Sequence, residues 1–464
     1  MSWRDAFRKW RERSRSKGPS ESRPKGRDRG VNRLARNHED WAADQFEGIP
    51  IEAPIRQLVI GLDFGTSYTK VAIGEVRTSY AVPFVLSDGN VSYLLPTVLQ
   101  WDREESDQVH LQSANPALTR IDRLKIRLLD GDTSAEARMH VVAYVALVLR
   151  HVRGWLMTTH SGAYGNNRLD WLINIGLPTE TYFGSGLAQV YKEVVEAAWR
   201  LSLRQGPLTM AAAWAEFDEP PPEPAGGALH PDKISPFPEL AAEVAAYLRS
   251  PMRREDLHLL VDVGAGTLDV AIFNVYETDD EEPLLPVFAK SVSRHGTAYL
   301  MDARRSCLPV GRKLGWSYQD PVPDIAAIVA HTGVPESQLR EKDTEFEREV
   351  RQAILAPVRE TWERKYPSSR RWEEGVPLIA CGGGMGSEYF DELVNRLVAR
   401  GKPFAFQRLR FPRPENLQAP DARPEDVDRL NVAYGLSFDP FDIAHTWGPD
   451  EIEDFPRDTS SSTY

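Results

Sequence analysis

Two stretches of the chain share one pattern: an apolar run that ends on an aspartate, a turn of small residues, and a second run with apolar residues at alternate positions. The first stretch, Leu58 to Gly74, reads LVIGLDFGTSYTKVAIG. The second, Leu257 to Tyr276, reads LHLLVDVGAGTLDVAIFNVY. A period of two around a glycine-containing turn predicts a β-hairpin in both places.

The turns of both hairpins carry residues that suit an anion. Glycine lets a ligand approach the backbone, and successive amide groups in a turn form a donor nest for phosphate. The turn residues are Gly65, Thr66, Ser67, Gly264, Gly266 and Thr267. The aspartates before the turns, Asp63 and Asp262, would repel an anion unless a divalent cation lies between the carboxylates and the anion. The pattern predicts a nucleotide with magnesium, and for one hairpin alone an ordinary glycine turn explains the sequence equally well.

A third glycine cluster follows the apolar run Pro377 to Ala380 and precedes a helical pattern. Its glycines would let a flat base and a ribose lie against the backbone. They are Gly382, Gly383 and Gly384. Two phosphate hairpins of one design, each leading its own α/β half, describe a duplicated protein that closes on a nucleotide from both sides.

These stretches resemble the phosphate-1, phosphate-2 and adenosine motifs of the actin-like ATPase superfamily. The amino-acid sequence of these motifs is most similar to that of the seventy-kilodalton heat-shock chaperones of the DnaK type, above all in DFGTSYTKVAIG and DVGAGTLDVAI. Shorter matches in the same order extend the resemblance from Leu58 to Phe438. It implies an α/β, two-lobed, duplicated actin-like ATPase (ribonuclease H-like) fold, with ATP and Mg²⁺ in the cleft between the lobes.

The resemblance also implies roles for the carboxylates. Asp262 would orient the attacking water and join the metal shell, while Asp63 and Glu239 would hold the metal through waters. Glu239 begins a predicted helix, Leu240 to Leu248. A glutamate in a first helical turn is also favoured by the helix dipole alone, and that explanation stays open.

A lysine is expected at the γ-phosphate, and two candidates remain. Lys125 is the local match to the lysine of DnaK-like proteins, whereas Lys70 takes the position used in actin and in sugar kinases. Lys70 could instead be a strand lysine that faces solvent. DnaK-like proteins bring Lys and Arg from a charged helix of this kind onto adenine, and Arg348 or Arg351 could serve here, although charges in such a pattern usually only solvate a helix face.

Changes in composition along the chain predict its domain organisation. The expected segments are a disordered basic N-terminal arm (1–50), lobe I (57–252) with an inserted subdomain (about 79–131) and a proline-rich loop (about 216–238), lobe II (255–440) with an outer subdomain (about 306–370), and an acidic C-terminal tail (441–464). Within the arm, Trp3, Phe7 and Trp10 lie at helical spacing among basic residues. That pattern predicts a short helix in residues 1–40 that packs on the body of the protein or docks on an anionic membrane or a partner.

Composition limits the cellular setting. The net charge of −12 argues against a protein that coats nucleic acid, and no specific nucleic-acid partner is expected. The two cysteines form no CxxC motif, which favours a reducing compartment. No run reaches about 18 apolar residues, and the N-terminus lacks an apolar signal core. We therefore expect a cytoplasmic protein.

Three classes of function fit these observations. The first is a slow ATPase of the DnaK type, a conformational switch or chaperone-related protein, which would act through a protein partner or client because no room remains after Phe438 for a peptide-binding domain. The second is a small-molecule (sugar) kinase, because DFGTS with Lys70 also resembles those enzymes. The third is an actin-like filament-forming ATPase.

Overall fold

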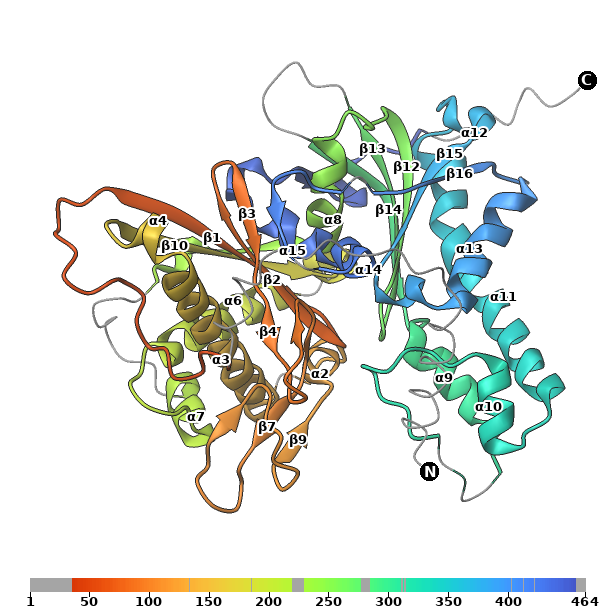
Figure 1. Ribbon diagram of the computed structural model, residues 1–464. Coiled ribbons are helices and arrows are strands. Elements are labelled where there is room, and N and C mark those ends of the chain that lie inside the picture. Colours follow the sequence, from red (N-terminus) through yellow and green to blue (C-terminus); the bar gives the residue numbers. More distant parts are fainter. Residues whose placement is uncertain are drawn as a thin grey trace, which may run out of the picture.

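The structure is a computed structural model that describes residues 36–455, except for 133, 185, 219–228, 277–283, 310–311, 313, 402, 412 and 421. The described chain forms two lobes, each built on one large β-sheet, with helices α8 (Glu239–Leu248) and α15 (Asn431–Leu436) between them (Figure 1). Both predicted hairpins are present, and they form the centre of each sheet.

The seven-stranded sheet of lobe I has the order β11-β10-β1-β2-β3-β17, and β6 also pairs with β2. β1, β2 and β3 are antiparallel, whereas β10 and β11 run parallel to β1. The strands are β1 (Ile55–Phe64), β2 (Tyr68–Glu75), β3 (Thr78–Ala81), β6 (Leu95–Pro96), β10 (Arg168–Leu177), β11 (Ile234–Pro238) and β17 (Leu417–Gln418).

The six-stranded sheet of lobe II repeats this arrangement with the order β16-β15-β12-β13-β14-β18. Three antiparallel strands are again followed by two parallel ones, and a parallel strand from the C-terminal part of the chain completes each sheet. The strands are β12 (Asp256–Val263), β13 (Leu268–Val275), β14 (Leu284–Ser293), β15 (Val376–Cys381), β16 (Phe406–Leu409) and β18 (His445–Trp447). The predicted duplicated, two-lobed α/β organisation is confirmed.

Helices cover the sheet of lobe I. They are α2 (Leu124–Leu129), α3 (Ala135–Thr159), α4 (Ser161–Tyr164), α5 (Thr179–Gly184), α6 (Leu187–Ser202) and α7 (Met210–Asp218). α3 is long and apolar enough to span a membrane by length and composition, but 94% of its most apolar window is buried inside the lobe, as in a core helix. Two arginines on this helix, Arg150 and Arg153, are also buried, and their guanidinium groups donate to backbone carbonyls.

Lobe II carries its own helices and an outer subdomain. They are α9 (Thr297–Arg305), α10 (Ile325–Thr332), α11 (Glu336–Glu360), α12 (Arg371–Glu374) and α13 (Glu388–Arg400), while α14 (Pro424–Val427) lies in the later segment between β17 and α15. The apolar positions of α11, among them Phe346, Val350 and Ile354, are buried against the sheet. The helix passes through Pro357 and ends three residues later.

The two central helices join the lobes. α8 packs its apolar face on strands of lobe II, whereas α15 lies on β1 and β2 of lobe I. Gly435 of α15 lies so close to α8 that a Cβ atom there would collide with the backbone of Ala242. The helices can therefore cross at this separation only because Gly435 has no side chain.

The structure corrects the predicted N-terminal arm. Residues 36–50 pack on lobe I instead of forming a free arm: Arg150 Nη1 donates to the Glu39 carbonyl (2.9 Å) and Arg153 Nε to the Ala43 carbonyl (3.1 Å). Trp41 contacts the core of the lobe. The predicted basic helix lies outside the described residues.

Two predicted limits within lobe I are also wrong. Ser79, expected to open the inserted subdomain, belongs to β3 of the main sheet, so the insertion starts later, with the short strands β4 (Phe84–Val85), β5 (Val91–Ser92), β7 (Leu99–Trp101), β8 (Val109–His110) and β9 (Thr119–Ile121). The predicted proline-rich loop begins inside α7 and ends inside β11. Proline is tolerated in β11 because this strand lies at the edge of the sheet.

The C-terminal limits differ as well. β17 and α15, predicted within lobe II, return to lobe I. The predicted tail is not free as far as Phe455, because β18 pairs with β14, and Lys365 Nζ donates to the carbonyls of Pro449 (2.9 Å) and Ile452 (2.8 Å). The chain thus crosses between the lobes more often than the order of motifs indicated.

The crossing of α8 and α15 predicts the effect of a single methyl group. Gly435→Ala should lower the free energy of unfolding by about 1–3 kcal/mol, because the backbones must separate to accommodate it. Gly162→Ala, in α4 with nothing within 4 Å of the added Cβ, should stay within about 1 kcal/mol of wild type. Urea denaturation measures both variants, and equal stabilities would show that the crossing is not tightly packed.

Candidate nucleotide and metal site

The turns of the two hairpins lie against each other between the lobes. A Cβ atom placed on Gly266 would lie 3.5 Å from Thr66 Oγ1, across the gap between the lobes, and 3.2 Å from the Ile126 side chain. The predicted phosphate turns are therefore neighbours in space, with α2 beside them. Any anion bound by one turn would be within reach of the other.

Asp63 and Lys70 form an ion pair at the end of the first hairpin. They occupy opposite positions in the register of β1 and β2, and Lys70 Nζ lies 2.5 Å from Asp63 Oδ2. The exposed fractions of the two side chains are only 14% for Lys70 and 6% for Asp63. Lys70 is thus not a solvent-facing strand lysine, and its charge is held within the site.

Lys125 and Glu239 form a second buried pair. Lys125 Nζ donates to Glu239 Oε1 at 2.6 Å, which ties α2 to the first residue of α8. Burial opposes the charge on this lysine, but Glu239, Tyr191 and Asp63 together raise the pKa of Lys125 above its ordinary value. Lys125 therefore remains an ammonium group, and Glu239 does more than cap a helix dipole.

Three carboxylates gather on the side of lobe II. Asp262 and Asp269 are directly opposite in the register of β12 and β13, and Glu239 joins them, with one oxygen from each within 4.8 Å of the others. Like charges in opposite positions of a sheet repel. A hard divalent cation with oxygen ligands relieves this repulsion, so the donor set fits magnesium.

The pKa of Asp262 lies well above the ordinary value of an aspartate. Burial, followed by the charge of Glu239, raises the pKa of Asp262 to about 7, while Lys70 and Lys125 act in the opposite direction. A carboxyl group that changes protonation near neutral pH can accept a proton during a reaction.

Glu243 lies one helical turn after Glu239 on α8 and is buried. Burial and the nearby Asp262 and Asp63 raise the pKa of Glu243 well above its ordinary value, and its carboxyl group hydrogen-bonds with Cys381. A protonated, neutral Glu243 fits this crowded position. Neither Glu243 nor Asp269 was predicted from the sequence, although the spacing of four residues between Glu239 and Glu243 and the position of Asp269 opposite Asp262 are signals that point to them.

The first turn also contains an unpartnered polar group. Ser67 Oγ is buried and has no hydrogen-bond partner among the described residues. A buried hydroxyl without a partner is costly, so a ligand oxygen at this turn would satisfy it. The turn therefore fits a phosphate. In the second turn, the Gly264 amide donates to the Thr267 carbonyl at 2.8 Å and closes the loop.

The third glycine cluster packs directly on the carboxylate site. Gly382 has φ +85°, and a Cβ atom on it would collide with Asp262 Oδ1. A Cβ atom on Gly384 would collide with the Val263 side chain and lie 3.0 Å from Thr297 Cγ2, and Gly383 faces the guanidinium of Arg429. The cluster thus lies beside the predicted metal ligands, and its contact with a nucleoside stays a prediction.

The contact of Arg348 with adenine stays a prediction. Its side chain is exposed on α11, and none of its described contacts involves the glycine cluster. Arg429, which was not predicted from the sequence, lies beside the glycine cluster, between Tyr68 of the first hairpin and Gly383.

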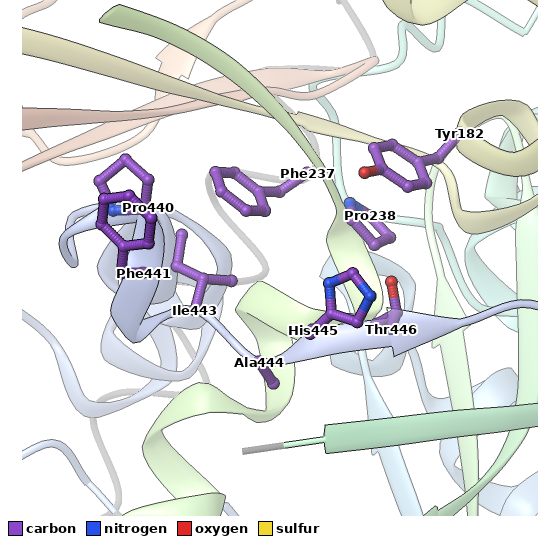
Figure 2. Close-up of a pocket in the computed structure, with 9 residues that line it drawn as sticks. All are labelled: Tyr182, Phe237, Pro238, Pro440, Phe441, Ile443, Ala444, His445 and Thr446. Atoms are coloured by element: carbon purple, nitrogen blue, oxygen red, sulfur yellow. The ribbon is translucent and has the colours of Figure 1, made fainter. Parts of the chain in front are cut away.

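A cavity of about 140 Å³ lies outside this cluster. Figure 2 shows the side chains around it, which come from α5, from β11 and from the C-terminal segment, and include Tyr182, Phe237 and Phe441. Pro238 lines this cavity and immediately precedes Glu239. The cavity is therefore a feature of the joint between the lobes and not the site of the carboxylates.

No protein-family model matches the chain, and no curated protein matches it. Among solved structures, it is similar to MreB5 of Spiroplasma citri bound to ADP, with a TM-score of 0.44, and to MreB 5 of the same organism bound to AMPPNP, with a TM-score of 0.42. In each case the sequence identity is 12%, and the match covers 82% of this chain and 94% of the other.

The pKa of Asp262 predicts how magnesium binding depends on pH. Because this pKa, about 7, lies above its ordinary value of 3.8, the folded chain holds a proton that the unfolded chain has already lost. Without a cation, stability therefore falls as the pH rises between these values. A cation competes with that proton, so magnesium should raise the melting temperature more at about pH 8 than at about pH 6.

Thermal denaturation with and without MgCl₂ measures the effect. In the Asp262→Asn variant, which carries no titrating group at this position, the dependence on pH should largely disappear. Equal magnesium shifts at both pH values in the wild-type protein would contradict a metal site that includes Asp262.

Proposed function

We propose that the protein binds ATP with magnesium and hydrolyses it slowly to ADP and phosphate in the cleft between the lobes. One observation carries the proposal: two phosphate-type turns from opposite lobes lie together, with two buried lysines and the carboxylates Asp63, Glu239, Asp262 and Asp269 around them. Cations for phosphate and oxygen ligands for magnesium are thus placed side by side.

The residues divide between binding and chemistry. Magnesium supplies charge neutralisation at the phosphates, and Glu239, Asp262 and Asp269 would hold it, with Asp63 nearby. Lys70 and Lys125 are both close enough to the turns to contact phosphate as point charges. Asp262 would orient the attacking water and accept its proton, a task that suits a pKa near neutrality.

Lys70 favours an ATPase of the actin type over one of the DnaK type. In the resemblance, this lysine matches actin and sugar kinases and has no counterpart in DnaK, and here it lies buried in the site, paired with Asp63. We therefore place a filament-forming ATPase ahead of a DnaK-like chaperone switch. A sugar kinase remains the second candidate for the same reason.

Two measurements on one sample distinguish these classes. A filament former releases phosphate from ATP without a sugar and sediments in the presence of ATP and magnesium. A kinase needs a sugar to consume ATP and stays in the supernatant. A chaperone-type switch hydrolyses ATP alone and also stays in the supernatant.

Asp262→Asn should lower the rate of ATP hydrolysis on the order of a hundredfold or more while leaving ATP binding much less affected, because one transition-state contact is lost. Phosphate release and equilibrium binding measure the two effects. Asp391→Asn, which removes a surface carboxylate paired with Arg408, is the control and should match the wild type. Unchanged turnover in Asp262→Asn would reject the role of this residue.

A further inference from the structure

Arg429 reaches from the C-terminal segment into the predicted nucleotide site. It lies in a 3₁₀ turn, Asp428–Leu430, directly before α15, which packs on lobe I. Its Cζ lies 4.8 Å from the centroid of the Tyr68 ring, next to the first phosphate turn. The side chain of Arg429 therefore extends from the turn before α15 to the first hairpin.

The same guanidinium also touches lobe II. Its Nη2, Cζ and Nε atoms lie 3.1, 3.5 and 3.6 Å from the position of a Cβ atom on Gly383. The flat group thus covers the backbone of the third glycine cluster, where the absence of a side chain leaves room for it. Arg429 bridges the first and third motifs of the site.

The charge of Arg429 is not paired directly with a carboxylate among the described residues. Burial lowers the pKa of Arg429, and Tyr68, Asp426 and Asp63 act against this, but an arginine remains charged. Within the described part of the chain, Arg429 has no hydrogen-bond acceptor and no ion-pair partner, and its contacts are the Tyr68 ring and Gly383. A guanidinium has five N–H donors, and leaving them unsatisfied in a largely enclosed place is costly.

The neighbours of Arg429 indicate which ligand would satisfy these donors. Lys70 and Lys125 each already have a carboxylate partner within 2.6 Å, whereas Arg429 has none among the described residues. A planar guanidinium binds a phosphate group through two parallel hydrogen bonds, which an ammonium group cannot do. The ring and the glycine cover the side chain, while its donor edges stay available to an anion.

We propose that Arg429 binds the phosphate chain of the nucleotide and thereby links the C-terminal segment to both lobes when nucleotide is bound. This inference rests on the proposed function, because it requires a nucleotide in the cleft. It adds a third cation to the two lysines.

Two variants of similar length separate charge from packing. Arg429→Met fills the space over Gly383 without charge, and Arg429→Lys fills it with charge retained. We expect the dissociation constant for ADP with magnesium to rise about tenfold or more in Arg429→Met and to rise by a smaller factor in Arg429→Lys, which keeps the charge but loses the second parallel hydrogen bond. Isothermal titration calorimetry measures both, and thermal denaturation checks that each variant is folded.

Arg408→Ala, which removes an arginine paired with Asp391 on the surface of lobe II, is the control and should bind ADP as the wild type does. Equal dissociation constants for Arg429→Met and Arg429→Lys would overturn the inference, because a packing role makes no distinction of charge. If the wild-type protein itself binds no ADP, the proposed function fails first and the role of Arg429 fails with it. If the wild type binds ADP and only the two variants are equal, the role of Arg429 alone is rejected.

Discussion

Repulsion between carboxyl groups at the junction of the lobes is the constraint on which the site depends. Asp63, Glu239, Glu243, Asp262 and Asp269 come from both lobes and from the helix that joins them, and most of their surface is withdrawn from water. Lys70 and Lys125 compensate one carboxylate each. The remaining charge is reduced by protons on Asp262 and Glu243, and a divalent cation would do the same. The fold thus holds together a group of charges whose repulsion lysines, protons or a divalent cation must offset.

The duplicated sheet explains how the chain achieves this. In each lobe an aspartate lies near the end of the first strand of the central hairpin, and Asp63 on β1 is close enough to Asp262 on β12 to raise the pKa of its carboxyl group. Glycine permits two further close approaches, at the crossing of α8 with α15 and between Gly382 and Asp262. The charged residues and these glycines therefore lie together at the junction of the lobes.

The sequence predicts the local parts of this arrangement well. Both hairpins, their turns and the pairing of two α/β halves follow from periodicity and from glycine, because strands and turns are determined by near neighbours. It also names Asp63, Lys70, Lys125, Glu239 and Asp262, which the structure brings together. Their separate roles are not visible from the sequence, since the choice of partner for each lysine depends on how α2 and α8 pack.

Long-range features escape such reasoning. Residues after Asn416 return to lobe I through β17 and α15, and then to lobe II through β18, and no local pattern announces these crossings. Arg429 enters the site only because of this path, which explains why it was missed. The role predicted for Arg348 depends on the pattern of a charged helix, and such a pattern does not distinguish a ligand contact from a solvated surface.

The central claim is that one magnesium-dependent nucleotide site lies between the lobes. Calorimetric titration of the wild-type protein with ADP, in the presence and in the absence of magnesium, tests it most directly. We expect one ADP per chain and an affinity at least about tenfold higher with magnesium, because the cation relieves the repulsion between the carboxylates and the phosphates. The absence of binding at millimolar ADP, or an affinity that does not change with magnesium, would contradict it.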